Sequence, residues 1–100
     1  MIVISFLDGT DITITEETVL NGFRNFSDDL EKEFYLKKVY SNSINGNETE
    51  GASRLSTDDN KVGIMGFILS VDCFSIGEDS SIIYRSSAVK SVENSNFSFG

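Results

Sequence analysis

Apolar and polar residues alternate at the start of the chain and predict a β-hairpin. Isoleucines recur at every second position on both sides of Asp8-Gly9, and this period is typical of two strands joined by a tight turn. A loop over residues 7–9 keeps these isoleucines on one face and gives Gly9 the positive φ that a bulge requires, whereas a two-residue loop would mix the faces. The predicted cross-strand pairs are Ile4 with Ile12 and Ile2 with Ile14.

The spacing becomes helical after the hairpin. Residues 15–22 predict a short helical turn, with a capping threonine at its start and a glycine at its end. A longer helix is expected from Ser27 or Asp28 onward, because Asp28 and Glu31 have the spacing of a capping box and lysines trail the acids. Residues 34–40 fit the end of this helix and the start of a strand equally well. The apolar face of the helix would carry Phe23, Phe26, Leu30 and Phe34.

The second half of the chain predicts strands. Residues 62–76 carry apolar side chains on both faces of an alternating pattern, which indicates a central strand or one bent at Gly66. Two short strands are expected at 81–85 and 88–93, interrupted at Ser86-Ser87. Strands grouped apart from helices favour an α+β fold. We expect a small antiparallel β-sheet or partly open barrel of about five strands, with one or two short helices inserted after the N-terminal hairpin.

The length and local composition predict one domain and a tail. A chain of 100 residues corresponds to one domain, and we assign residues 1–93 to a single globular domain. Within it, residues 41–61 form a long polar loop. Residues 94–100 read as a flexible C-terminal tail, in which Phe97 and Phe99 are candidate contacts for another chain.

The residue inventory removes most catalytic chemistry. The chain has no histidine, so catalytic Ser–His and Cys–His arrangements are excluded. Its one cysteine, Cys73, lies in the most apolar stretch, where we expect a buried and unreactive thiol. Zinc needs clusters of Cys or His, and a calcium loop beginning at Asp58 fails because Val62 and Leu69 occupy positions that require oxygen ligands. We therefore expect no enzyme activity, no cofactor and no metal.

Charge is the property of the composition that points to a function. The chain has sixteen acids and eight bases, for a net charge of −8, and residues 1–33 hold −6 of it. This imbalance disfavours direct binding to nucleic acid and can steer a basic partner toward the first third of the chain. The expected contact residues are Glu16, Glu17, Asp28, Asp29, Glu31 and Glu33.

The general profile of the chain also suggests a source. The lack of proline, the scarcity of alanine and the abundance of Ile, Asn and Ser indicate an AT-rich coding sequence, as in a low-GC bacterium or one of its phages. In size, charge and this codon character, the chain resembles the small acidic phage-encoded anti-defence proteins, including anti-CRISPR inhibitors that compete with nucleic acid for a basic groove. The resemblance assigns no residues. It implies that the partner is a basic protein surface, such as that of a nucleic-acid-binding protein.

The leading hypothesis is a non-enzymatic acidic binding or inhibitor protein in the cytoplasm of a bacterial host cell. A lone cysteine fits a reducing compartment, and the N-terminus lacks the basic region of a signal peptide. No apolar run approaches the ~20 residues that span a membrane. Two alternatives stay open: a small phage structural or assembly protein that forms homo-oligomers through sheet edges, and a sponge for a small neutral ligand.

Overall fold

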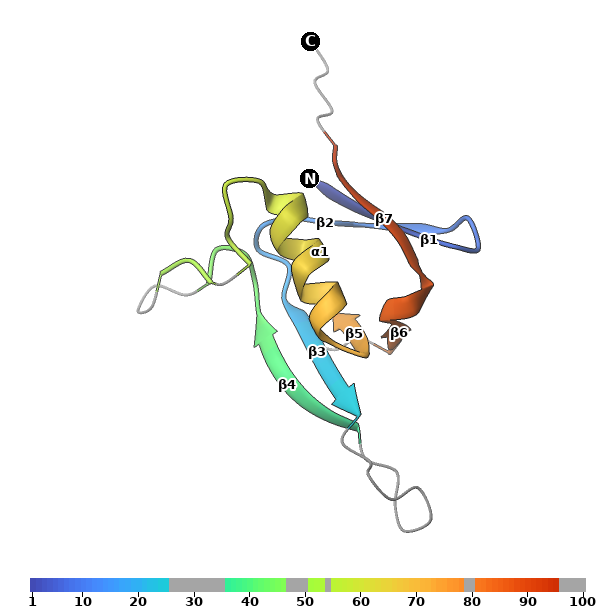
Figure 1. Ribbon diagram of the computed structural model, residues 1–100. Coiled ribbons are helices and arrows are strands. Elements are labelled where there is room, and N and C mark those ends of the chain that lie inside the picture. The colour runs from blue at the N-terminus through green and yellow to red at the C-terminus, as the bar shows by residue number, and fades with distance from the viewer. Residues whose placement is uncertain (26–35, 47–50, 54, 79–80, 96–100) are drawn as a thin grey trace.

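The computed structural model describes residues 1–25, 36–46, 51–53, 55–78 and 81–95 (Figure 1). Over these residues the chain forms two antiparallel sheets, of three and four strands, and one α-helix. The predicted α+β class with antiparallel sheet structure is therefore confirmed. Within the described part of the chain the strands form two open sheets and no closed barrel.

The first sheet contains the hairpin that the sequence predicts. Its strands are β1 (Ile2–Phe6), β2 (Asp11–Ile14) and β7 (Val89–Asn94), in the order β2-β1-β7. Gly9 has a φ of 91°, as the three-residue loop requires. The Asp8 carboxylate braces this loop by accepting hydrogen bonds from the Thr10 hydroxyl (2.6 Å) and backbone N–H (2.9 Å). Both predicted pairs are confirmed, Ile4 with Ile12 and Ile2 with Ile14.

The second sheet includes residues that the sequence predicts to be helical. Its strands are β3 (Leu20–Asn25), β4 (Leu36–Asn42), β5 (Cys73–Ile76) and β6 (Tyr84–Arg85), in the order β4-β3-β5-β6. The helical turn predicted for 15–22 is wrong, because β3 begins within that range and only a short turn precedes it. Gly22, read as a helix end, lies within β3. A Cβ there would come within 2.8 Å of Val71 Cγ1, so Gly22 permits close packing in the interior of the fold.

The longer predicted helix, from residue 27 onward, covers residues that the structure does not describe and residues that it does. The start of the longer helix falls in 26–35, outside the described residues. Of the two readings of 34–40, the strand is correct from Leu36 onward, where β4 begins. The strand pairs with β3 through residue 42, with a register shift between Gly22 and Phe23.

Helix α1 (Asn60–Ser70) replaces most of the strand predicted for 62–76. The prediction is wrong for 62–70 and right for 73–76, which form β5. Alternation and helical spacing both fit this apolar segment, and the structure buries the helical set, whereas Leu69 of the alternating set is 79% exposed. The buried residues Ile64, Phe67, Ile68 and Val71 follow i, i+3, i+4, i+7 spacing.

One core joins the helix to both sheets. Phe74 on β5 is fully buried, and its ring lies 6.4 Å from Phe6 of β1, 6.4 Å from Phe67 of α1 and 5.4 Å from Tyr84 of β6, measured between centroids. Cys73, expected to be buried, is half-buried because it borders a surface pocket. The buried apolar residues are Ile2, Ile4, Phe6, Ile14, Leu20, Ile44, Leu55, Ile64, Phe67, Ile68, Val71 and Phe74.

The segment predicted to be a polar loop, residues 41–61, contributes two residues to this core. Ile44 and Leu55, from the segment predicted to be a polar loop, are each 3% exposed. The predicted interruption at Ser86-Ser87 is confirmed as a 3-10 helix, η1 (Ser86–Ala88). After β7, the backbone N–H of Ser95 donates to the Met1 carbonyl oxygen (2.8 Å). The first two residues of the predicted tail are therefore held by the first sheet.

Candidate functional site

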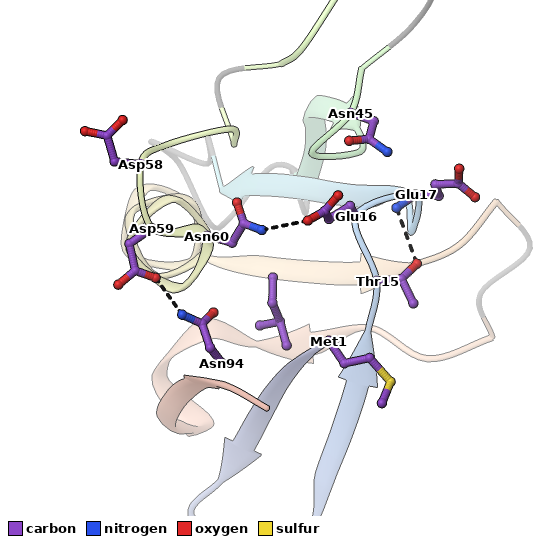
Figure 2. A pocket seen from close by; sticks show the side chains of 10 residues that line it. Met1, Thr15, Glu16, Glu17, Asn45, Asp58, Asp59, Asn60 and Asn94 are labelled. Atoms are coloured by element: carbon purple, nitrogen blue, oxygen red, sulfur yellow. Dashed lines mark hydrogen bonds between the residues drawn. The ribbon is translucent and has the colours of Figure 1, made fainter. Parts of the chain in front are cut away.

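A surface pocket of about 690 Å³ lies where the two sheets and the start of α1 meet (Figure 2). Its lining comes from the connection between β2 and β3, the segment that leads into α1, and the ends of β1 and β7. We call it the acidic pocket because its lining includes four carboxylates. The lining residues are Met1, Ile2, Thr15, Glu16, Glu17, Asn45, Asp58, Asp59, Asn60 and Asn94.

Glu16 and Glu17 are positioned by a turn between β2 and β3. The backbone N–H of Thr15 donates to the Thr18 hydroxyl (2.9 Å), and the N–H of Glu17 donates to the Thr15 hydroxyl (3.3 Å). Asn60 Nδ2 at the start of α1 donates to Glu16 Oε1 (3.1 Å), as Figure 2 shows. The turn is therefore joined directly to the helix N-terminus.

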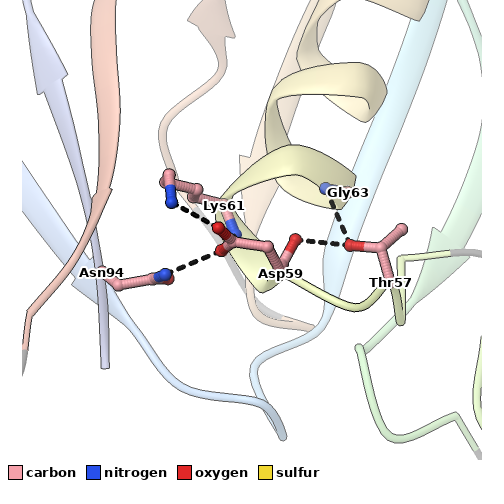
Figure 3. Close-up of polar contacts among 5 residues, drawn as sticks. All are labelled: Thr57, Asp59, Lys61, Gly63 and Asn94. Atoms are coloured by element: carbon pink, nitrogen blue, oxygen red, sulfur yellow. Dashed lines mark hydrogen bonds and ion pairs between the residues drawn. The ribbon is translucent and has the colours of Figure 1, made fainter.

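Asp59 is the N-cap residue of α1 (Figure 3). Its carboxylate accepts a hydrogen bond from the Lys61 backbone N–H (3.3 Å) and one from Asn94 Nδ2 (2.7 Å), and it forms an ion pair with the Lys61 ammonium group. The hydrogen bond from the Lys61 side chain, followed by that from Asn94, holds the pKa of Asp59 below its ordinary value of 3.8. Asp59 is therefore ionised at neutral pH and ties α1 to β7.

The neighbouring Thr57 completes the cap. Its hydroxyl donates to the Asp59 carbonyl oxygen and accepts a hydrogen bond from the Gly63 backbone N–H (3.2 Å) (Figure 3). The same N–H also donates to the Asp59 carbonyl oxygen (3.4 Å), so Thr57 shares the first intrahelical hydrogen bond of α1. Because Thr57 and Asp59 are both fixed, the exposed Asp58 between them is held at the pocket.

The pocket carries more negative charge than its own contacts neutralise. Within the described part of the chain, Lys61 pairs with Asp59, whereas Glu17 and Asp58 have no ion-pair partner. Clustered like charges of this kind set up a potential that attracts cationic groups. Among the described residues, no three acidic or cysteine side chains converge closely enough to hold a metal ion. Carboxylates that are spread out in this way suit several separate cationic side chains better than a single ion.

Two of the six predicted acidic contact residues lie among the residues that the structure describes. Glu16 and Glu17 lie together at the pocket. The four acids Asp28, Asp29, Glu31 and Glu33 lie outside the described residues, as do Phe97 and Phe99. Sequence reasoning missed Asp58 and Asp59 as partners of the glutamates. The sequence Thr-Asp-Asp-Asn over residues 57–60, before an apolar run, is a helix-start signal. This signal predicts a helix that begins at residue 60 and has both aspartates at its N-terminus.

Comparison with known proteins does not supply a function for this site. No protein-family model, no curated protein and no solved structure matches the chain. Among the described residues, no helix has the length and apolar character needed to cross a membrane. The chemistry of the pocket and the charge of the chain are therefore the two properties that bear on function.

Proposed function

We propose that this protein is a non-enzymatic binding protein that engages a basic surface of a macromolecular partner through the acidic pocket. The observation that supports this most directly is that four carboxylates, from two segments far apart in the sequence, line one pocket. Only one of the four is neutralised by an ion pair within the described residues. A net charge of −8 adds long-range attraction to the same class of partner.

Lysine and arginine side chains of the partner are the groups that this pocket would recognise. Each exposed ion pair contributes only about 0.2–1 kcal/mol, so useful affinity requires several pairs formed together. The amide groups of Asn45, Asn60 and Asn94 lie beside the carboxylates and can accept further hydrogen bonds from guanidinium groups. Binding would then be fast and dependent on salt, as electrostatically steered association is.

The finer form of the proposal is inhibition of a nucleic-acid-binding protein. Carboxylates on an acidic surface can occupy the basic groove where the partner binds phosphates, so the protein would compete with nucleic acid. An anti-defence role of the anti-CRISPR type, in the cytoplasm of a phage-infected bacterium, is the biological setting that we propose. Direct contact with nucleic acid is disfavoured because the phosphates would meet like charge.

The test is a titration with a fluorescently labelled peptide rich in lysine and arginine, followed by anisotropy at about 0.05 M and about 0.5 M salt. The pocket variant combines Glu16→Gln, Glu17→Gln and Asp58→Asn. We expect it to bind about tenfold more weakly at low salt, which is the loss of three exposed ion pairs of about 0.5 kcal/mol each. Its affinity should also depend less on salt than that of the wild type.

A matched control separates the pocket from the overall charge. Asp11→Asn, Glu78→Gln and Glu93→Gln change the net charge equally, and these three exposed acids line no part of the pocket. The control should bind within about twofold of the wild type. Equal losses in both variants, or a wild-type affinity that does not change with salt, would contradict the proposal. A pull-down from a low-GC bacterial lysate at the same two salt concentrations would then identify the partner.

Self-association is the second candidate function, and one observation favours it. Strand β4 lies at the edge of the second sheet, and its Leu36 and Val39 are 47% and 41% exposed. An exposed edge strand can pair with another chain, although Lys37 and Lys38 on the same strand oppose this by charge. Sedimentation equilibrium of the full chain and of a chain ending at residue 95, which keeps all of β7, would test it. A monomer in both cases would exclude this candidate.

A further inference from the structure

A second pocket, of about 530 Å³, lies between α1 and β4. We call it the apolar groove because most of its lining is aliphatic, aromatic or glycine. The principal lining residues are Val39, Tyr40, Leu55, Val62, Gly66 and Phe67. It shares no lining residue with the acidic pocket, so an inference about it does not depend on the function proposed above.

The size and chemistry of the groove fit a small molecule. Ligand pockets have volumes of about 300–1,000 Å³ and a mostly apolar lining with a few polar groups. Arg24 also lines the groove, but it already has an interaction partner, and we assign it no role. The acidic character of the chain opposes anionic ligands. Because burying a charge against this mostly apolar lining is unfavourable, the groove favours a neutral, mostly apolar molecule.

Two glycines of α1 border the groove for different reasons. A Cβ on Gly63 would come within 2.2 Å of the Leu55 carbonyl oxygen, so glycine is needed there for packing. A Cβ on Gly66 would meet no atom within 4 Å. Glycine in the middle of a helix is unfavourable relative to alanine, and no packing contact accounts for it at this position. Its effect is to leave open the space that a side chain on α1 would otherwise occupy.

Tyr40 contributes its side chain to the wall of the groove. Its ring packs against Phe67 at 5.6 Å between centroids. Its hydroxyl is buried and has no hydrogen-bond partner within the described residues. Because the protein covers this oxygen, a ligand in the groove would meet the ring of Tyr40 and not its hydroxyl.

We propose that the apolar groove binds a neutral, mostly apolar small molecule, with the ring of Tyr40 as part of its wall. The ligand lies against Val39 and Phe67, and the space beside Gly66 holds part of its apolar body. Binding involves no covalent step. The complex is stabilised by the removal of apolar surface from water.

The probe for this site is N-phenyl-1-naphthylamine, a neutral aromatic amine whose fluorescence rises in apolar surroundings. We expect the wild-type protein to give a saturable increase with one binding site. Gly66→Leu should lower the affinity at least tenfold, because the leucine side chain fills the space that the probe needs. Gly66→Ala adds only a Cβ that meets nothing, so it should fold normally and lower the affinity by about twofold.

Leu69→Ser is the matched control for unspecific binding to the helix. Leu69 is 79% exposed on α1 and does not line the groove, so this variant should bind the probe as the wild type does. Equal binding by Gly66→Leu and wild type, or a loss of binding in Leu69→Ser, would overturn the proposal. Absence of any saturable signal from wild-type protein would also overturn it.

Two further measurements test the role of Tyr40 and the nature of the occupant. Tyr40→Phe keeps the ring that lines the groove and should bind the probe as the wild type does; a large loss of affinity would overturn the assignment of the ring as the contact. Sedimentation equilibrium with and without the probe tests a second copy as the occupant. A dimer that the probe dissociates would mean that another chain fills the groove, and it would overturn the small-molecule assignment.

Discussion

The acidic pocket and the apolar groove differ in chemistry although helix α1 contributes to both. Asp59 and Asn60, at the start of the helix, line the acidic pocket, whereas Val62, Gly66 and Phe67, along its body, line the groove. The pocket is built from exposed side chains on turns and strand ends, and the groove is built from the flank of the core. One short element can therefore offer a charged surface at its end and an apolar surface along its side.

This difference predicts how the two regions respond to substitution. Exposed charges can be changed with little effect on folding, because water solvates them in the unfolded and folded chain alike. Three side chains of the groove, Leu55, Phe67 and Val71, belong to the close-packed core, where each change in volume alters the free energy of unfolding. The pocket should thus be separable from the fold, and the groove should not.

The largest loss of stability is expected from a substitution in the core that underlies both the acidic pocket and the apolar groove. Phe74→Ala deletes a fully buried ring that packs against Phe6, Phe67 and Tyr84. We expect the free energy of unfolding to fall by about 3–5 kcal/mol, as for other buried phenylalanines, in urea titrations followed by circular dichroism. The control Leu7→Ala removes a side chain that is 68% exposed and should change it by less than about 0.5 kcal/mol. A loss below about 1 kcal/mol for Phe74→Ala would contradict the assignment of the core.

A smaller change in stability is expected at the apolar groove, and its sign should differ between two glycines of α1. Gly63→Ala would bring a Cβ within 2.2 Å of the Leu55 carbonyl oxygen and should destabilise the fold by about 1–3 kcal/mol. Gly66→Ala meets no atom within 4 Å and should stabilise it by about 0.5–1 kcal/mol through better helix propensity. Thermal unfolding of the two variants measures both effects. The same sign at both positions would show that the packing of α1 has been described wrongly.

The next prediction concerns the acid dependence of stability at the start of α1. Because the pKa of Asp59 is lower in the folded chain than its ordinary value of 3.8, ionised Asp59 stabilises the fold above that pH. This stabilisation is lost as the pH falls through the lower, folded pKa. Asn can still cap the helix, so Asp59→Asn should be less stable than wild type at neutral pH, and the difference should vanish in strong acid.

Urea titrations at a series of pH values would test this dependence. The pKa of Asp8 is also lowered, by hydrogen bonds from Thr10, so both proteins keep that part of the acid dependence and only their difference is informative. Asp58→Asn is the control, because its carboxylate accepts no hydrogen bond and forms no ion pair within the described residues; we expect a nearly unchanged free energy of unfolding at neutral pH. A constant difference between Asp59→Asn and wild type across all pH values would rule out the ion pair with Lys61.

The smallest effect on stability is expected for the charges of the acidic pocket. The combined variant Glu16→Gln, Glu17→Gln and Asp58→Asn should change the free energy of unfolding by less than about 0.5 kcal/mol, since these three side chains are exposed. Thermal unfolding at neutral pH measures it. A large loss would mean that the pocket is part of the folding core and that its binding and folding roles cannot be separated.

The sequence predicts the elements whose pattern is local. In the N-terminal hairpin, the parity of the isoleucines and the need for a positive φ at Gly9 determine the register, and both lie within a few residues of each other. Segment 62–76 could not be assigned in this way, because its apolar residues satisfy the strand and helix periods alike. The tertiary contacts of Phe67 and Val71 with Gly22 decide between them, and a single sequence does not display such contacts.

The same distinction applies to the candidate site. Charge alone identified Glu16 and Glu17, because a local excess of acids is visible in the composition. Their neighbours Asp58 and Asp59 come from a distant segment, and the hydrogen bond between Asn60 and Glu16 that joins the segments is a long-range contact. The sequence therefore pointed to the two glutamates that line the pocket and not to the two aspartates at the start of α1.

The most direct test of the central claim is a pair of amide chemical-shift titrations on ¹⁵N-labelled wild-type protein. The ligand in the first is the unlabelled lysine- and arginine-rich peptide, and in the second it is N-phenyl-1-naphthylamine. We predict that the peptide shifts the amides of Glu16, Glu17, Asp58 and Asn60, while the neutral probe shifts those of Val39 and Gly66. Peptide-induced shifts that are spread evenly over the surface, or that centre on the groove, would contradict the claim that the acidic pocket is the binding surface for a basic partner.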